Sequence, residues 1–279
     1  MQITEVGPGI FACLMANETA NAGFVITARG VIVVDSLSTP AQGRELAAAI
    51  RAQTHQPVLL VVNTHHHFDH VLGNQAFAAP VIAHCALAQQ LAQAAARDLG
   101  PADVDAWIVE HPEDRWLVDE LELIYPNILF EDHLLIDLPP RRLVVQHLGG
   151  HTPDSSIVDL TEQGVVFAGD LVFEGRVPFL RHANIRRTID ALRSLERRGA
   201  RTVVPGHGDL CDTAYVARLR GYLEALVEAV GRLAAKGRTK EEVLDSGQLP
   251  PCWTDDRPDL RRANVERVYD ELSGAAAAI

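Results

Sequence analysis

The sequence lacks several features that define whole classes of protein. Its four cysteines are scattered and form no CxxC pair, which is typical of reduced thiols rather than of a disulfide framework. No apolar run approaches the roughly 18–20 residues that span a bilayer. The first fifteen residues contain no basic stretch followed by an apolar core, so the sequence as it stands carries no secretory signal. We therefore expect a cytoplasmic protein that does not enter a membrane.

Positive charge is also scarce. The 279 residues include 37 acidic and 25 basic side chains, a formal net charge of −12, and no dense run of Lys or Arg. A phosphate backbone would be repelled on average, so we expect no nucleic-acid partner. Hydrophobic residues make up 47% of the chain and charged residues 22%, which excludes wholesale disorder.

Short apolar runs between turn residues predict β-strands in two successive blocks. The predicted strands of the first block are Ile10–Met15, Phe24–Ala28, Val31–Val34 and Val58–Val62. Those of the second block are Leu134–Leu138, Leu143–His147, Ser156–Leu160, Val165–Ala168 and Thr202–Pro205. Helical spacing predicts helices over Pro40–Thr54, about Ala86–Leu99 and Ile185–Arg198. The alternation favours an α/β protein with two sheets packed together and covered by helices on both sides.

The pattern becomes purely helical from Thr213 onward, where apolar residues step by three and four. We therefore expect an α/β domain over residues 1–212, with a helical insertion at about 86–130, and a helical C-terminal extension over 213–279 packed on it. Thr239 followed by Glu242 predicts a capping box at the start of one helix of the extension.

Histidine is abundant, with 12 residues, and several are clustered. The segment from His65 to His70 has the form H-x-H-x-D-H and directly follows a predicted buried strand. In an extended loop the side chains of His65, His67 and Asp69 point the same way, whereas His70 turns toward a neighbouring site. Imidazole and carboxylate groups are the ligands of catalytic zinc, so this segment predicts a metal site.

Three more candidate ligands each lie at the end of a predicted strand. His151 follows two glycines that allow a tight turn, Asp170 follows Gly169, and His207 stands between Gly206 and Gly208. Ligands of α/β proteins bind at the carboxyl ends of strands, so these positions converge with the histidine cluster.

These motifs occur in the order Asp35, HHHFDH, GGHTPDS, AGD and PGHG, and with them the sequence resembles the metallo-β-lactamase superfamily of binuclear zinc hydrolases. The resemblance extends from about Ile10 to Gly208. It implies a four-layer αββα sandwich, with metal ions in a cleft along one edge of the two sheets. It also implies that Asp35 is buried near the site.

The resemblance further implies two Zn²⁺ ions per chain, with iron or manganese as alternatives. The implied ligands are His65, His67 and His151 for the first ion, Asp69, His70 and His207 for the second, and Asp170 bridging both. A hydroxide shared by two such ions exists at neutral pH, because coordination lowers the pKa of water to about 7. Asp69 would orient this hydroxide and move its proton.

The resemblance implies hydrolysis of a carbonyl ester, thioester or lactone in a small-molecule substrate. Within the superfamily, Asp170 and the lack of an export signal make the sequence most similar to the glyoxalase II-like, cyclase-like and quinoprotein-associated hydrolases, and less similar to dedicated β-lactamases. Cyclic amide hydrolysis of the β-lactamase type and iron-dependent persulfide dioxygenation remain alternatives on the same fold.

Specificity is expected to come from two segments. The loop Gly175–Asn184 carries Arg176, Arg181 and His182, which would contact an anionic part of a substrate. The second segment, within the insertion, carries Trp116 and Tyr125, which would form an apolar lid over the cleft or part of a homodimer contact.

Overall fold

Two β-sheets form the centre of the protein in a computed structural model that describes residues 1–16, 19–98, 109, 121–252 and 257–274. The first sheet has seven strands in the order β1-β2-β3-β4-β5-β6-β7. Its strands are β1 (Gln2–Gly7), β2 (Ile10–Leu14), β3 (Ala22–Ile26), β4 (Val31–Val34), β5 (Val58–Val62), β6 (Val81–His84) and β7 (Ile128–Phe130). The second sheet has five strands in the order β12-β11-β10-β9-β8. Its strands are β8 (His133–Leu138), β9 (Arg141–His147), β10 (Ser156–Leu160), β11 (Val165–Phe173) and β12 (Thr202–His207).

Each sheet combines antiparallel and parallel strands. Strands β1 to β4 pair antiparallel, whereas β4 to β7 run parallel. In the second sheet β8 to β11 pair antiparallel and β12 lies parallel to β11. The segments that follow β5 and β12 therefore leave from the carboxyl ends of parallel strands, the usual place for a ligand site in an α/β protein.

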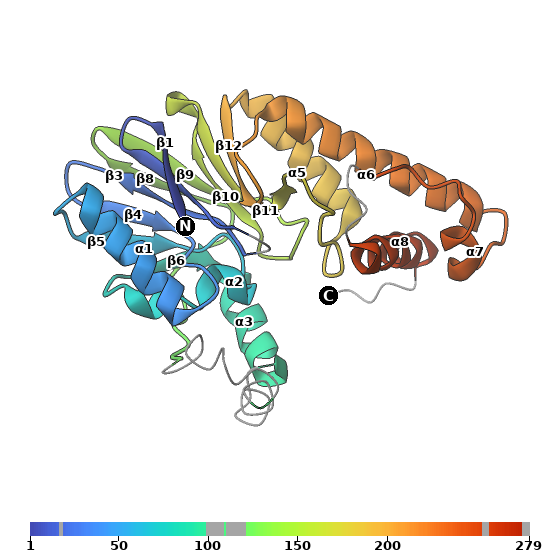
Figure 1. The fold of residues 1–279 in the computed structure, drawn as a ribbon, viewed down its shortest axis with the longest axis horizontal. Helices are drawn as coiled ribbons and strands as arrows, with labels where there is room; N and C mark the ends of the chain where they lie inside the picture. The colour runs from blue at the N-terminus through green and yellow to red at the C-terminus, as the bar shows by residue number, and fades with distance from the viewer. Residues whose placement is uncertain (17–18, 99–108, 110–120, 253–256, 275–279) are drawn as a thin grey trace.

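Helices cover both outer faces of the paired sheets (Figure 1). The helices of the described residues are α1 (Pro40–Gln53), α2 (Phe68–Val71), α3 (Cys85–Asp98), α5 (Ile185–Arg198), α6 (Thr213–Ala234), α7 (Lys240–Leu244) and α8 (Pro258–Ser273), with 3-10 turns at Asn74–Ala76 and Thr161–Gln163. One buried cluster joins α1 to the first sheet through Leu46 and Ile50. A second fills the space between the sheets, and a third joins the second sheet to α5 and α6. These layers confirm the predicted αββα sandwich.

The C-terminal helices α6, α7 and α8 share the third cluster with the second sheet. Leu219 of α6, Val243 of α7 and Val265 of α8 are buried in the same group as Val172 of β11. Thr239 and Glu242 form the predicted capping box of α7. The division at residue 212 stays a proposal, because this hydrophobic core is continuous across it.

The structure also differs from the predictions at several elements. Strands β1, β6 and β7 were not predicted, and β11 continues past Ala168 to Phe173. The segment expected to be a helical insertion is helical through α3, but Ile128–Phe130 forms an edge strand of the first sheet. Most of the residues between them lie outside the described part of the chain. No helix among the described residues is long and apolar enough to cross a membrane.

Candidate metal centre

The loop after β5 brings the H-x-H-x-D-H segment to the edge where the two sheets meet. His67 stands at the N-cap of the one-turn helix α2, which begins at Phe68 and includes Asp69 and His70. The backbone N–H of His70 donates to the carbonyl of His67 at 3.0 Å. This helical turn separates the direction of His70 from that of His65 and His67, as the sequence predicts.

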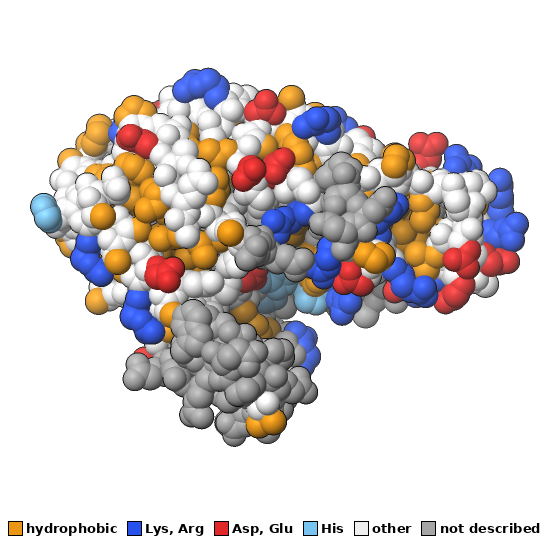
Figure 2. All heavy atoms as spheres, in the orientation of Figure 1, with side chains coloured by type: hydrophobic (Ala, Val, Ile, Leu, Met, Phe, Trp, Pro, Cys, Tyr) orange, Lys and Arg blue, Asp and Glu red, His pale blue; other side chains and the backbone are white. Residues whose placement is uncertain are grey.

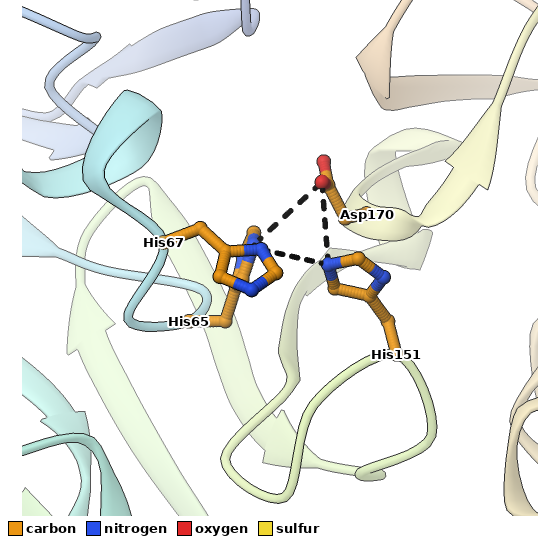
Figure 3. A group of neighbouring side chains, drawn as sticks. All are labelled: His65, His67, His151 and Asp170. Carbon is orange, nitrogen blue, oxygen red and sulfur yellow. Dashed lines mark hydrogen bonds and ion pairs between the residues drawn. The ribbon is translucent and has the colours of Figure 1, made fainter. Parts of the chain in front are cut away.

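Four of the candidate ligands form a first donor group (Figure 3). The Nδ1 atom of His67 lies 3.1 Å from Nε2 of His65 and 3.0 Å from Nε2 of His151. The Oδ2 atom of Asp170 lies 3.7 Å from Nε2 of His65 and 3.4 Å from Nε2 of His151. Three imidazole nitrogens and one carboxylate oxygen therefore converge on one point.

A second donor group lies beside the first and consists of Asp69, His70 and His207. The Oδ2 atom of Asp69 lies 3.2 Å from Nε2 of His207 and 3.8 Å from Nε2 of His70. The other carboxylate oxygen of Asp170, Oδ1, lies 3.1 Å from Nε2 of His70 and 3.4 Å from Nε2 of His207. Asp170 thus directs one oxygen toward each group, and each group combines side chains attached to both sheets.

Hydrogen bonds on the outer side of two rings determine which nitrogen faces inward. The Nδ1 atom of His151 lies 3.1 Å from the carbonyl oxygen of Phe179, and Nδ1 of His70 lies 2.8 Å from Oδ2 of Asp35. A carbonyl or carboxylate oxygen only accepts, so Nδ1 of each ring carries a proton. In the neutral rings the lone pair of Nε2 then points into the donor groups, as metal ligation requires.

Two buried atoms between the groups are suited to a cation. Nε2 of His70 and Oδ1 of Asp170 have no hydrogen-bond partner among the described residues, although they lie 3.1 Å apart. Burial lowers the pKa of His70, but the carboxylates of Asp170, Asp35 and Asp69 outweigh it and raise this pKa well above its usual value. The position therefore favours positive charge, which a metal ion held by both atoms would supply in place of the proton. Imidazole and carboxylate donors fit zinc, and also iron or manganese.

The charges of the site oppose the effect of burial. Burial lowers the pKa of His207, but the carboxylates of Asp170 and Asp69 outweigh it and raise this pKa to about 9. Burial dominates at His151 and lowers its pKa to about 4. Burial raises the pKa of Asp170, but the neighbouring imidazoles outweigh it and hold this pKa well below the usual range. The carboxylate is therefore ionised at neutral pH and available as a ligand.

Asp35 supports the second group from behind. Its carboxylate accepts hydrogen bonds from the backbone N–H and the hydroxyl of Thr64, each at 2.8 Å, besides the one from His70. The residue is buried and adopts a left-handed backbone conformation with φ of 56°. Asp35 therefore orients the His70 ring and fixes the start of the histidine loop.

A cavity of about 770 Å³ opens over the two donor groups, and its lining includes His67, Asp69, Asp170 and His207. Figure 2 shows histidine side chains in the hollow between the sheets and the C-terminal helices, with Lys and Arg side chains beside them. The donor groups are thus accessible to a small molecule from one side.

The predicted substrate contacts divide into three sets. Arg176 lines the cavity, whereas Arg181 is exposed and does not line it. His182 places Nδ1 at 2.9 Å from Nε2 of His67, so it contacts a candidate ligand. Tyr125 is 43% exposed and does not line the cavity, and Trp116 lies outside the described residues.

The structure adds cavity residues that the sequence analysis did not identify. Arg257 and Leu260, from the start of α8, line the cavity together with Met15. None of these residues belongs to a recognisable motif, and α8 follows the motif-bearing segment by some fifty residues. Sequence spacing therefore carries no signal that the extension reaches the site.

Comparison with known proteins agrees with this geometry. The profile of the Metallo-beta-lactamase superfamily matches residues 17–207. The match covers more than half of the chain, so the chain belongs to the metallo-β-lactamase superfamily.

Individual relatives are more distant. An acyl-coenzyme A thioesterase, MBLAC2, from Homo sapiens is 31% identical over 156 residues, which is 53% of this chain and 56% of the relative. This chain thus matches little more than half the length of that curated relative. A metallo-beta-lactamase family protein from Thermus thermophilus has a TM-score of 0.67 and 21% identity, covering 98% of this chain and 96% of that one. The sec-alkylsulfatase Pisa1 from Pseudomonas sp. has a TM-score of 0.74 and 18% identity, covering 98% and 50%. At these identities the solved structures show a shared fold.

Proposed function

We propose that the protein is a metal-dependent hydrolase that holds two metal ions, preferentially zinc, and cleaves a carbonyl thioester. The observation that carries this proposal is the placement of Asp170, whose two carboxylate oxygens face two separate donor groups beneath one cavity. The proposed ligands are His65, His67 and His151 for the first ion, Asp69, His70 and His207 for the second, and Asp170 for both.

Divalent ions bound in such a site lower the pKa of water to about 7 and polarise a carbonyl oxygen. Side chains of the protein position the attacking water and accept its proton. The side chain of Asp69 is 34% exposed, whereas those of Asp170 and His207 are 4% and 9% exposed. Asp69 is therefore the carboxylate that reaches water in the cavity, where it accepts a hydrogen bond from the attacking water and takes up its proton.

The choice of a thioester rests on the curated relatives, which are described as acyl-coenzyme A thioesterases. Thiolate is a good leaving group, so the reaction needs no general acid with a raised pKa. Esters and lactones share the attack on a carbonyl carbon and differ in the leaving group. Cyclic amide hydrolysis and persulfide oxidation are the competing activities that an experiment must separate from it.

The test is a substrate panel on protein purified without added metal, after its metal content has been measured by mass spectrometry. The panel contains short- and long-chain acyl-coenzyme A, an aryl ester, an acyl-homoserine lactone, nitrocefin and glutathione persulfide. We expect thioester hydrolysis that a chelator abolishes and zinc restores. Asp69→Asn should lower kcat by on the order of 100-fold, whereas Asp137→Asn, on the exposed face of β8, should leave it unchanged.

Two results would overturn the proposal. Turnover of nitrocefin without thioester hydrolysis would assign the site to cyclic amides. Iron in the isolated protein, together with oxygen consumption on the persulfide, would assign it to dioxygenation.

A further inference from the structure

One face of α8 holds the segment between β11 and α5, together with the start of α5. The side chains of Asn264, Arg267 and Glu271 recur at intervals of three and four residues, so they project from the same side of the helix. Glu271 accepts hydrogen bonds from the backbone N–H groups of Ile185 and Arg186, at 2.8 and 3.2 Å. The Nε atom of Arg267 donates to the carbonyl of Ala183 at 2.6 Å.

Asn264 makes the most enclosed of these contacts, because it is only 1% exposed. Its Nδ2 atom donates to the carbonyl of Pro178 at 2.8 Å. Its Oδ1 atom accepts from the backbone N–H of Leu180 at 3.2 Å. One amide side chain therefore satisfies buried main-chain groups on both sides of Phe179.

The second of these bonds leads directly to the first donor group. The N–H of Leu180 and the carbonyl of Phe179 belong to the same planar peptide unit and point in opposite directions. That carbonyl accepts from Nδ1 of His151 at 3.1 Å. A rigid peptide thus connects Asn264 on one side with His151 on the other, and the two hydrogen bonds polarise each other.

The same segment contacts another member of the group. His182 precedes Ala183, which Arg267 holds, and its Nδ1 lies 2.9 Å from Nε2 of His67. Because Nδ1 of His67 faces the donor group, its Nε2 carries the proton and donates it to His182. The segment therefore orients two of the three imidazoles of the first group.

We propose that α8 is a positioning element of the first donor group, and that Asn264 is the residue through which it acts. This inference rests on the proposed function, in which the first group holds a metal ion. Neither Asn264 nor His182 belongs to the two donor groups, and both act through the rings they orient. The C-terminal extension is then part of the active centre rather than an appended unit.

The test compares Asn264→Ala with Tyr269→Phe in the full-length protein. Tyr269 is on the same helix, and its hydroxyl donates to the carbonyl of Arg238, away from the site, so its loss serves as the control. Imidazole ¹⁵N–¹H spectra of the metal-free protein report whether His151 carries its proton on Nδ1. Chelator competition reports the affinity of each metal ion, and steady-state kinetics separate kcat from KM.

We expect Asn264→Ala to broaden or shift the Nδ1–H signal of His151. It should also lower the affinity for one of the two zinc ions about tenfold, and lower kcat with little change in KM. Tyr269→Phe should change none of these. An unaltered His151 spectrum in a folded Asn264→Ala variant would overturn the inference, whether or not the protein proves to be a thioesterase. If wild-type protein bound no metal, the proposed function would fail while the spectra still decided the positioning role.

A second pair of variants covers the case in which Asn264→Ala does not fold. His182→Asn keeps an acceptor near the position of Nδ1, whereas His182→Leu removes it. We expect the Asn variant to retain zinc affinity and the Leu variant to lose about tenfold. Equal affinity in both variants would contradict the positioning of His67 by this segment.

Discussion

Among single residues, Asp170 has the greatest effect on the charge and spacing of the proposed site. Each of its carboxylate oxygens lies within 3.4 Å of an imidazole nitrogen in a different donor group. Its negative charge also reduces the repulsion between two cations held side by side. The second group depends on it more, because its remaining donors are two imidazoles and one carboxylate that is partly exposed to water.

Asp170→Asn should therefore retain one tightly held metal ion and lose the other. The substitution keeps the size of the side chain but removes its charge, and we expect kcat/KM to fall on the order of 100-fold or more. Metal content after dialysis against a weak chelator, together with kinetics, checks this outcome. A variant that keeps both ions and full activity would rule out a bridging role.

The pKa of His207 is raised and that of His151 is lowered, and these opposite shifts predict how the stability of the metal-free protein depends on pH. His207 has a pKa raised to about 9, so its contribution to stability is complete below about 6.5 and is lost as the pH rises toward 9. His151 has a pKa lowered to about 4, so the unfolded chain takes up a proton first as the pH falls below about 6.5.

The free energy of unfolding of the metal-free protein should thus be greatest at about pH 6.5 and decline at both lower and higher pH. Denaturant titrations between pH 4.5 and 9 with a chelator present measure it. A profile that is flat over this range would show that the two histidines titrate alike in the folded and unfolded chains.

At the scale of elements, β11 approaches β12 so closely at Gly169 and Asp170 that Gly206 has no room for a side chain. A Cβ atom there would lie 1.9 Å from Oδ1 of Asp170 and 2.8 Å from the backbone of Gly169. Backbone on the neighbouring strand cannot yield, so the carboxylate would be displaced from the second donor group. The glycine before His207 is therefore a requirement of the site rather than of a turn.

Gly206→Ala should weaken metal binding and lower kcat/KM on the order of 100-fold. Gly221→Ala is the matched control, because Gly221 lies in α6 with nothing within 4 Å of its added Cβ atom. In a helix interior the control change should stabilise the fold by about 0.5–1 kcal/mol. Normal zinc content in the Gly206 variant would show that Asp170 can move without loss.

The elements show why some of the fold was predictable and some was not. Strand β4 is a continuous apolar run and helix α5 has clear helical periodicity, so the sequence predicts both with the bounds that the structure shows. Strand β7 is only three residues long and takes its place from pairing with β6, which local sequence does not encode. Gly169 was interpreted as a strand end, yet β11 absorbs its positive φ of 51° and continues.

The same contrast applies to the site. The candidate ligands lie in short motifs at or near the carboxyl ends of strands, with Asp170 inside β11, so their convergence could be predicted from the sequence. The roles of Asn264 and Arg257 depend on how α8 lies against a loop some eighty residues away, and neither residue stands in a motif. The amphipathic spacing of a helix can be recognised in the sequence, but it does not identify the surface against which the helix packs.

For the whole molecule, the net charge is −12, and the cavity lining is also acidic, with two arginines against four carboxylates. Arg176 and Arg257 approach the cavity from different elements, and Arg257 is held by Asp259 at 2.9 Å. Under the proposed function, they would provide cationic groups where an extended anionic leaving group passes from the donor groups to solvent. Glu174 and Asp209 also line the cavity, so the arginines act locally rather than through an overall field.

Arg257→Ala should then raise KM for acyl-coenzyme A by about tenfold, the equivalent of about 1.4 kcal/mol, and leave hydrolysis of an uncharged acyl thioester unchanged. Added salt should raise KM for the charged substrate alone. Kinetics on the two substrates at low and high ionic strength measure both effects. An equal change for both substrates would mean that Arg257 acts on the fold and not on the leaving group.

Each donor group takes side chains from both sheets, and this determines when a growing chain can first bind metal tightly. The chain emerges from its N-terminus, so His65, His67 and Asp69 are exposed long before His207 is made. Early in translation these side chains are an incomplete set of ligands, able to hold a passing ion only weakly. The full set first exists when β12 joins β11, and the rings of the first group are oriented later still, when α8 docks. Tight binding of the proposed metal ions would therefore require both sheets to be assembled, unlike binding in local zinc modules whose ligands lie close together in sequence and fold around the ion.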